Sequence, residues 1–248
     1  MCGRYVNPAT AEAERYFAVH LIRWKFDRSY NVAPTQQVPV VRLADGQREG
    51  LMMRWGLVPF FAKGVPPKYS TINATIEKLT DGPTWRGPWK RGQRCILPAA
   101  GFYEWHVNED GTKTPFYITM ADQPVFGFAG LWDRSVSAEG TALESCTIIT
   151  MPPNALMAEI HNAKQRMPAI LQNADTESWL TGSTDEARAA LKPYPDDLMH
   201  ALKVSTRVNS PKNNHASLIE PESSPTMTPG EDRTTEQAPL DPGPFVLE

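Results

Sequence analysis

Residues 37–55 read QVPVVRLADGQREGLMMRW and give the strongest indication of how this chain folds. Two extended, mostly apolar runs, 37–43 and 50–55, lie on either side of the dipeptide Asp45-Gly46. Asp-Gly between two such runs is a strong signal for a tight turn that joins antiparallel strands. We therefore expect a β-hairpin here and a fold rich in antiparallel strands.

The same pattern continues toward the C-terminus. Aliphatic and aromatic residues dominate five further extended runs, separated by turn residues, at 94–97, 101–105, 115–119, 125–132 and 145–150. Their order along the chain predicts successive hairpins. Cys95 and Cys146 lie inside two of these runs and are interpreted as small core residues.

Short helices are expected around these strands. The first begins with Asn7 as N-cap and Pro8 at the first helical position, and runs to Val19. Three more are expected at 154–160, 175–180 and 183–191, the last with Ser183 and Glu186 in capping-box spacing. Together the elements predict an α+β fold: a core of antiparallel β-sheets, barrel-like or mixed, with peripheral helices.

A change in composition near residue 221 sets the expected domain boundary. Residues 221–248 are rich in Pro, Ser, Thr and acids and carry a net charge of −5, so they bury too little apolar surface to fold and are predicted to be disordered. Residues 1–220 show no repeat or second linker, which predicts one domain, with a monomer as the default state. Their net charge is +2, and the basic run 86–94 indicates either a basic patch or an ordinary solvated face.

Several classes of protein are excluded by what the chain lacks. No apolar run is long enough for a membrane span, and the N-terminus has no secretory signal layout, which predicts a cytoplasmic protein, associated with the nucleoid if the source is bacterial. Three cysteines without CxxC spacing indicate neither a disulfide framework nor a zinc cluster. The histidines have no metal-binding spacing, so neither a metal nor a small-molecule cofactor is expected.

Cys2 directly follows the initiator methionine, and its small side chain permits removal of Met1. The new N-terminal residue would carry an α-amine and a thiol, whose ordinary pKa values of about 7.7–8.0 and about 8.5 leave part of each nucleophilic at neutral pH. The amine can condense with an aldehyde, and the thiol can then close a thiazolidine. The same pair can act in amide hydrolysis. The alternative is that position 2 tolerates any residue.

Three more side chains are candidates for chemistry. Glu104 lies among aromatic residues in GFYEW (101–105), where desolvation would raise its pKa toward the range useful for proton transfer. Strand alternation puts Phe102 on its face and Tyr103 on the other. His161 is a candidate general acid or base, and Asn73 can donate and accept hydrogen bonds. The alternatives are a salt-bridged or exposed glutamate and a structural histidine. Aromatic residues at 55–61 and 85 are interpreted as core or as base-stacking groups.

A series of short motifs runs through the chain in a fixed order: MCGRY (1–5), YNVAPT (30–35), WGLVP (55–59), INA (72–74), RCILPA (94–99), GFYEW (101–105), IH (160–161), RMPAIL (166–171), VS (204–205) and VN (208–209). This ordered set, covering residues 2 to about 220, resembles the SOS response-associated peptidase (SRAP) family of abasic-site processing proteins. The family fold is a compact α+β domain of antiparallel sheets with a DNA-binding groove.

The resemblance implies an enzyme-like reaction with DNA. Cys2, exposed by removal of Met1, would crosslink through a thiazolidine to the aldehyde of an abasic site in single-stranded DNA and shield the lesion during the DNA damage response. The family's catalytic positions fall on Cys2, Asn73, Glu104 and His161. The resemblance also implies peptidase-type hydrolase activity, used to expose the cysteine, and lyase-like activity. Positions at or near family DNA contacts are Arg4, Pro34, Phe61, Arg86 and Arg166.

The chain departs from the family pattern at three places. The family usually has Arg, a phosphate contact, where this chain has Thr75, and often Trp where Phe61 stands. Residues 163–165 lengthen a segment that some members keep shorter. Loss of one phosphate contact is expected to weaken DNA binding and flatten its salt dependence by about one charge. Lys164 is a candidate for the missing charge.

Two other functions are compatible with parts of the sequence. One is a cysteine-type peptidase acting on other proteins in trans, although the usual cysteine-protease signatures are missing. The other is a non-covalent single-strand DNA-binding module, in which Cys2 is incidental. Only the crosslinking hypothesis needs a cysteine at the mature N-terminus together with the other three catalytic positions.

Overall fold

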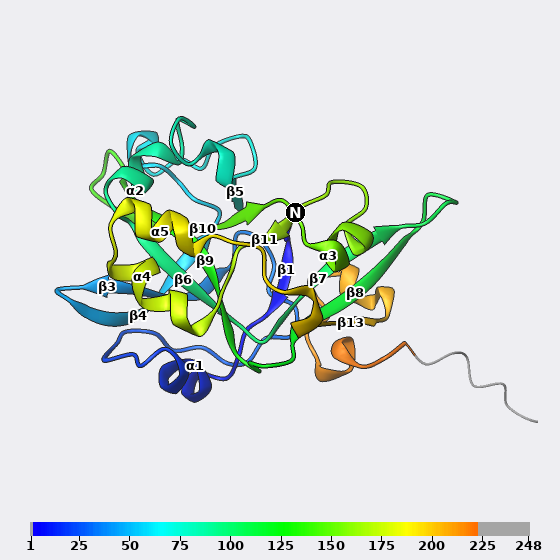
Figure 1. The fold of residues 1–248 in the computed structure, drawn as a ribbon. Coiled ribbons are helices and arrows are strands. Elements are labelled where there is room, and N and C mark those ends of the chain that lie inside the picture. Colours follow the sequence, from blue (N-terminus) through cyan, green and yellow to red (C-terminus); the bar gives the residue numbers. More distant parts are fainter. Residues whose placement is uncertain (1, 223–248) are drawn as a thin grey trace, which may run out of the picture.

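The hairpin predicted over residues 37–55 forms part of a closed barrel. In the computed structural model, which describes residues 2–222, β3 (Gln37–Ala44) and β4 (Gln47–Trp55) pair antiparallel across Asp45 and Gly46. Both turn residues have positive φ, 50° and 75°, as a primed hairpin turn requires. The other barrel strands are β6 (Arg94–Ala99), β9 (Phe126–Val136) and β10 (Ala142–Met151). The pairings run β4, β3, β6, β9, β10 and back to β4, which closes a five-stranded ring (Figure 1).

The barrel is mixed, which the expected barrel-like or mixed core included, and its strands are antiparallel except at one seam. β10 pairs with β4 in parallel, with Cys146 opposite Trp55. Two short strands outside the ring are also parallel to their partners, β2 (Leu21–Ile22) on β4 and β5 (Asn73–Thr75) on β10. The antiparallel strands β11 (Met167–Pro168) and β12 (Ile170–Leu171) complete this sheet. Parallel partners lie far apart in sequence and share no turn, which is why no local signal predicts them.

A second, four-stranded antiparallel sheet lies beside the barrel. Its order is β1 (Arg4–Val6), β7 (Gly101–Val107), β8 (Lys113–Met120) and β13 (Met199–Lys203). Successive hairpins are therefore only part of the fold, because the chain crosses from barrel to second sheet between β6 and β7. The predicted alternation in β7 is confirmed: Phe102 packs in the main core, whereas Tyr103 packs in a smaller second core.

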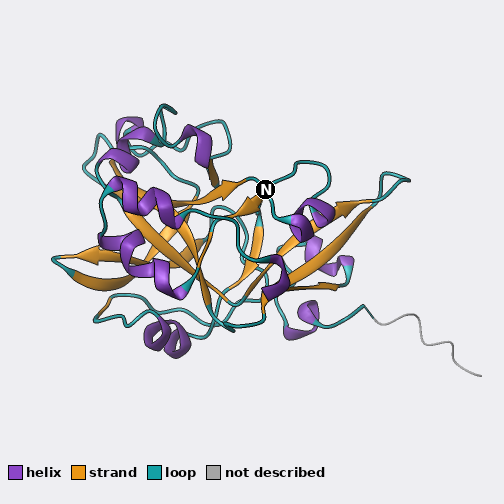
Figure 2. Ribbon diagram, in the orientation of Figure 1, coloured by secondary structure: helices purple, strands orange, loops and turns teal. Residues whose placement is uncertain are grey.

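The helices are short and lie at the periphery of the strands (Figure 2). The α-helices are α1 (Thr10–Tyr16), α2 (Arg86–Lys90), α3 (Ala155–Ile160), α4 (Thr176–Thr181) and α5 (Thr184–Ala190). The 3₁₀ helices are η1 (Phe60–Ala62), η2 (Ile76–Lys78), η3 (Asn173–Asp175), η4 (Asp196–Leu198), η5 (Thr206–Asn209) and η6 (Ala216–Ile219). The fold is thus α+β, as predicted.

The predicted N-cap of α1, Asn7, is wrong, whereas the predicted capping box of α5 is confirmed. The N-cap of α1 is Ala9, whose N–H donates to Glu12 at 2.9 Å. Asn7 instead binds a neighbouring loop, accepting from the N–H of Ser29 at 2.6 Å, so its side chain is used for tertiary contact. In α5, Ser183 and Glu186 form the expected capping box.

Two residues of the predicted acidic tail are part of the domain. Pro221 forms a bridge with Val204, and Glu222 makes an ion pair with Lys203 at 2.9 Å. The remainder of the tail, 223–248, lies outside the described residues. Within residues 2–222, no helix has the length and apolar character needed to cross a membrane.

Candidate active site

The pairing of β1 with β7 brings the N-terminal segment to Glu104. Arg4 lies opposite Tyr103 and Tyr5 opposite Phe102, so continuing this antiparallel register places residues 2 and 3 beside Glu104 and Trp105. Tyr5 and Val32 exchange backbone hydrogen bonds of 3.3 and 2.9 Å, which hold the other edge of β1. The side chain of Cys2 is fully buried. A short strand held on both edges thus fixes the position of the predicted nucleophile.

Asn73 reaches the same point from the main sheet. The parallel pairing of β5 with β10 sets Asn73 opposite Ile148 and leaves its side chain 7% exposed. Its Nδ2 donates to the carbonyl oxygen of Cys2 at 2.9 Å. Its Oδ1 is buried and has no hydrogen-bond partner among residues 2–222. Asn73 Nδ2 therefore holds the backbone of Cys2, and Asn73 Oδ1 remains a hydrogen-bond acceptor without a partner among the described residues.

His161 lies at the end of α3 with its ring oriented by the following loop. Its Nδ1 is 2.8 Å from the carbonyl oxygen of Arg166, so Nδ1–H donates and, in the neutral ring, Nε2 carries the lone pair. That Nε2 faces Glu104, 3.8 Å from Oε2. The predicted catalytic residues Cys2, Asn73, Glu104 and His161 therefore meet at one place.

Asn162 ties the histidine loop to the strand that carries Glu104. Its Oδ1 accepts from the N–H of Val107 at 3.0 Å, and its Nδ2 donates to the Val107 carbonyl oxygen at 2.9 Å. The Asn162 side chain thus makes the two hydrogen bonds to Val107 that the backbone of a neighbouring strand would make. Asn162 was not predicted as a site residue, and the available signal in the sequence was an amide next to a candidate histidine.

Burial sets the protonation states in the site. Desolvation raises the pKa of Glu104 to about 7. Burial raises the pKa of the Cys2 thiol well above its ordinary range, and the nearby Glu104 carboxylate acts in the same direction. Desolvation lowers the pKa of His161, so the ring is neutral at pH 7. In the chain that still carries Met1, burial therefore keeps the Cys2 thiol protonated at neutral pH, and reaction of the thiol requires a proton acceptor.

Two pockets adjoin this cluster. The first, of about 380 Å³, is lined by Glu104 and His161 together with Trp105, Lys164 and Asn209. Trp105 and Asn209 were not predicted as site residues; the indole Nε1–H donates to Asn209 Oδ1 at 2.9 Å. The second pocket, of about 440 Å³, is lined by Asn73 and Thr75. Lys164 thus lies in the pocket of Glu104, whereas Thr75 lines the other.

Two of the predicted DNA-binding arginines make internal contacts. Arg4 donates to Asn31 Oδ1 at 2.9 Å and to the carbonyl oxygens of Val208 and Asn209 at 2.8 and 3.1 Å, which fastens β1 to η5. Arg166 makes a bidentate ion pair with Glu77, at 2.8 and 3.0 Å. These contacts give both arginines structural partners, and their binding to DNA stays a prediction.

The other three predicted contacts lie nearer the surface. Arg86 is exposed on α2, Pro34 is partly exposed, and the ring of Phe61 is 50% exposed. Their binding to DNA also stays a prediction. Phe61 packs edge-to-face against Phe60, with 5.5 Å between ring centroids.

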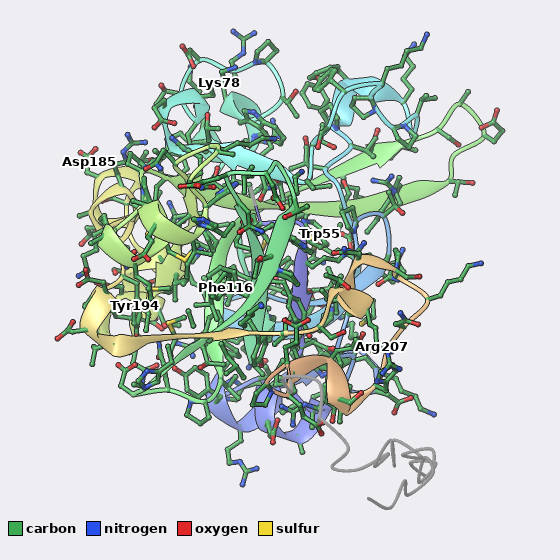
Figure 3. All side chains as sticks on the ribbon, turned by 90° about the vertical axis from the view of Figure 1, so that its right-hand side faces the viewer. Trp55, Lys78, Phe116, Asp185, Tyr194 and Arg207 are labelled. Carbon is green, nitrogen blue, oxygen red and sulfur yellow. The ribbon has the colours of Figure 1, made fainter. Side chains whose placement is uncertain are left out.

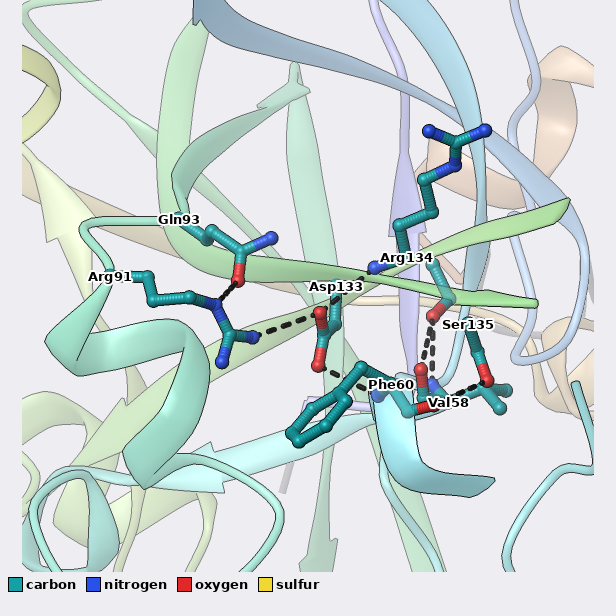
Figure 4. Close-up of polar contacts among 8 residues, drawn as sticks. Val58, Phe60, Arg91, Gln93, Asp133, Arg134 and Ser135 are labelled. Carbon is teal, nitrogen blue, oxygen red and sulfur yellow. Dashed lines mark hydrogen bonds and ion pairs between the residues drawn. The ribbon is translucent and has the colours of Figure 1, made fainter. Parts of the chain in front are cut away.

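The segment carrying these two rings is held from the barrel side by a buried carboxylate (Figure 4). Asp133 on β9 accepts from the N–H of Phe60 at 2.9 Å and from Arg91 at 3.1 Å. The Arg91 guanidinium lies 5.2 Å from the Phe60 ring centroid, a cation–π contact. Ser135 accepts from the N–H of Gly64 at 2.8 Å. The exposed rings are therefore presented by a firmly attached turn.

The remaining residues singled out by the sequence have plainer roles. Cys95 and Cys146 are buried in β6 and β10, which confirms them as core residues. Within the described part of the chain, no group of three or more His, Cys, Asp or Glu side chains is placed to hold a metal ion.

Comparison with known proteins gives a consistent result. The family model described as "SOS response associated peptidase (SRAP)" matches residues 1–211. The abasic site processing protein YoaM of Bacillus subtilis is 41% identical over 233 residues, covering 90% of this chain and 99% of that protein. YoqW, another abasic site processing protein of B. subtilis, is 42% identical over 200 residues, 79% of this chain and 87% of its own. A crystal structure from Bacteroides thetaiotaomicron superposes with a TM-score of 0.76 at 28% identity, covering 90% of this chain and 100% of that one.

Proposed function

The chain belongs to the SOS response-associated peptidase (SRAP) family, and on that basis we propose that it processes abasic sites in single-stranded DNA by capturing their aldehyde on Cys2. Its relatives at 41% and 42% identity are named abasic site processing proteins. The observation that carries the proposal is the meeting of Cys2, Asn73, Glu104 and His161, from four separate segments, beside one pocket. Neither a metal nor a cofactor is needed for the chemistry.

The proposed reaction uses both nucleophiles of an N-terminal cysteine. After Met1 is removed, the α-amine of Cys2 attacks the aldehyde carbon of the ring-opened sugar, and loss of one water gives an imine. The thiol sulfur then adds to the imine carbon, the thiol proton is passed to a base, the imine nitrogen gains a proton, and a five-membered thiazolidine closes. Asn73 supports this step because it holds the Cys2 carbonyl, which restrains the amine on the same residue.

Glu104 and His161 divide the proton transfers. The thiol is protonated in its buried site, so its proton must pass to an acceptor, and Glu104 has a pKa of about 7 that suits both uptake and release near neutral pH. His161 presents a neutral Nε2 toward the same pocket, which suits removal of the anomeric hydroxyl proton as the closed sugar opens. We assign the family's peptidase name to removal of residues ahead of Cys2, an amide cleavage that needs the same nucleophile and base.

The test is a denaturing gel of the protein, shown by mass spectrometry to lack Met1, after incubation with a single-stranded oligonucleotide carrying one abasic site. We expect a shifted band that survives denaturation and is absent from Cys2→Ala. Cys146→Ala, which changes another fully buried cysteine, is the matched control and keeps the band. A band that persists in Cys2→Ala would contradict the proposal. Cleavage of unrelated proteins without DNA would favour a peptidase in trans, and equal affinity for intact and abasic strands would favour a simple binding module.

The ion pair between Arg166 and Glu77 leads to a prediction about affinity. Glu77 occupies the guanidinium through two hydrogen bonds and so competes with any phosphate for Arg166. Glu77→Gln removes this competition. Because the Glu77 side chain is 53% exposed, the ion pair is worth up to about 1 kcal/mol, so we expect about fivefold tighter DNA binding. The measurement is fluorescence anisotropy with a single strand carrying tetrahydrofuran, a non-reactive abasic analogue.

Glu139→Gln serves as the control for this gain, because Glu139 is an exposed acid in the turn between β9 and β10. It removes the same charge without touching Arg166 and is expected to leave affinity within about twofold. Weaker binding by Glu77→Gln would show that Glu77 orients Arg166 for DNA and does not mask it.

A further inference from the structure

The second pocket is lined by Asn73 and is distinct from the pocket lined by Glu104 and His161. It is formed by β5, by η2 and by the segment that leads into α2, and its lining includes Tyr69, Asn73, Thr75, Lys78 and Trp85. Figure 1 shows β5 and α2 above the barrel strands, and Figure 3 shows Lys78 at the outer edge of the molecule. The pocket shares Asn73 with the candidate active site but plays no part in the proposed chemistry.

One wall of the pocket is an exposed aromatic ring in a fixed orientation. The side chain of Tyr69 is 57% exposed, yet its hydroxyl shares a 2.7 Å hydrogen bond with Thr84 Oγ1. Thr84 is itself buried, so the hydroxyl is attached to the body of the domain while the ring faces outward. A ring of this kind is what single-strand binding proteins use to stack nucleobases, because every base has a π-face. The tether reduces the entropy that stacking would otherwise lose.

The rim of the pocket carries an exposed cation. Lys78 is exposed and has no ion-pair partner within residues 2–222. Lys78 is the last residue of η2, and Thr75, three residues earlier, is its N-cap. A 3₁₀ turn repeats every three residues, so both residues lie on the pocket side. An ammonium group and an exposed ring that line one pocket match the phosphate and base of one nucleotide.

Asn73, which also lines the pocket, carries a hydrogen-bond acceptor without a partner among the described residues. Asn73 is more than nine-tenths buried, and its Oδ1 has no hydrogen-bond partner among the described residues. An unsatisfied buried acceptor costs free energy unless a ligand or water completes it. Because the same amide binds Cys2 through Nδ2, a ligand held here lies directly next to the captured residue.

We propose that this pocket holds the nucleotide adjacent to the abasic residue, with its base stacked on Tyr69 and its phosphate paired with Lys78. The inference rests on the proposed function, because it assumes that a single strand passes Cys2. It adds a neighbouring-nucleotide subsite, which would make the crosslink sensitive to the presence of a base beside the lesion.

The stacking part is tested with two variants of Tyr69 and non-reactive single strands that carry tetrahydrofuran at the abasic position. Tyr69→Ala is expected to bind about tenfold more weakly, whereas Tyr69→Phe, which keeps the ring and loses the tether, loses about twofold. The same measurement is repeated on strands in which the neighbouring nucleotide, on one side or the other, is replaced by a second tetrahydrofuran. On one of these two strands, wild type and Tyr69→Ala are expected to bind equally. If Tyr69→Ala weakens binding to both of these strands as much as it weakens binding to the strand with a single tetrahydrofuran, the base is not held by Tyr69.

The phosphate part is tested by salt dependence. Lys78→Gln is expected to reduce the slope of log affinity against log salt by about 0.7, the value for one contact on a single strand. Thr75→Arg in the Lys78→Gln background is expected to restore the slope, because position 75 lies on the same side of η2. Lys25→Gln removes one exposed charge between Trp24 and Phe26, which both hydrogen-bond to α1, and is expected to leave the slope unchanged. Figure 1 shows α1 at the opposite side of the barrel from β5 and α2. An unchanged slope in Lys78→Gln would overturn the phosphate contact.

The crosslinking gel separates failure of this inference from failure of the proposed function. If wild type forms no covalent band, the proposed function fails and the subsite with it. If wild type forms the band and Tyr69→Ala and Lys78→Gln both bind as wild type does, the subsite alone is wrong.

Discussion

Replacing Glu104 by glutamine will slow formation of the covalent product by about 10²- to 10⁴-fold, the usual contribution of a general acid–base group. Glutamine keeps the size and hydrogen-bonding capacity of the side chain but cannot take up the proton that the Cys2 thiol must lose. The pKa of Glu104 is raised to about 7 by desolvation, so the wild-type rate should fall as the pH drops below 7. In the variant this component disappears, and the remaining pH dependence follows the α-amine, whose ordinary pKa is about 7.7–8.0.

Glu104→Gln slows the reaction but is not expected to destabilise the fold above pH 7. A folded-state pKa raised from 4.5 to about 7 means that the fold favours the protonated carboxyl. This contribution to the free energy of unfolding is fully present below pH 4.5 and is lost as the pH rises through about 7. The loss is on the order of 3 kcal/mol for a group this deeply buried. Glu104→Gln removes it, so above pH 7 the variant should be at least as stable as wild type.

The measurement pairs single-turnover crosslinking at pH 5.5 to 9 (about seven points) with thermal unfolding over the same range. Glu109→Gln, an exposed glutamate in the turn between β7 and β8, is the matched control and should leave both profiles unchanged. Loss of rate together with loss of stability above pH 7 would indicate a structural role for Glu104. Wild-type rates in the variant would remove Glu104 from the mechanism.

Replacing Trp55 by alanine will destabilise the domain by about 3–5 kcal/mol, because it empties the space of a fully buried indole. For a domain of this size the melting temperature should fall by about 10 °C. Trp55 packs edge-to-face on Tyr5, with 5.4 Å between ring centroids, and its Nε1–H donates to the Ile72 carbonyl oxygen at 2.9 Å. It thus contacts both the strand that follows Cys2 and the residue before Asn73, and Figure 3 shows it in the interior of the molecule.

Trp55→Phe separates packing from the hydrogen bond. The Ile72 oxygen still accepts from Ile148 N–H at 3.0 Å, so losing the indole donor should cost only about 1 kcal/mol. Phe61→Ala is the surface control and is expected to change stability by about 0.5 kcal/mol or less, because that ring is half exposed. A melting temperature within about 2 °C of wild type for Trp55→Ala would show that the barrel closes over the lost indole. Calorimetry at a fixed pH provides the comparison.

Local signals predicted most of the individual elements. The hairpin at Asp45-Gly46, the alternation in β7 and the capping box at Ser183 depend on a few neighbouring residues, and each is confirmed. The N-cap at Asn7 failed because a tertiary contact with Ser29 used the side chain. The basic run at 86–94, interpreted as a patch or a solvated face, contains the short helix α2 and, in Arg91, a partner of the buried Asp133.

Residue identity and order fixed the fold class, the strand positions and the set of candidate residues, because turn chemistry, side-chain alternation and motif order are written locally along the chain. Barrel closure, the parallel seam between β4 and β10 and the second sheet required pairings between residues far apart in sequence, which no local pattern encodes. The protonation states of the site residues were likewise decided by the tertiary structure. Burial of Cys2, Glu104 and His161 together, produced only by the folded packing, shifts each pKa away from its ordinary value and turns three separate side chains into one site.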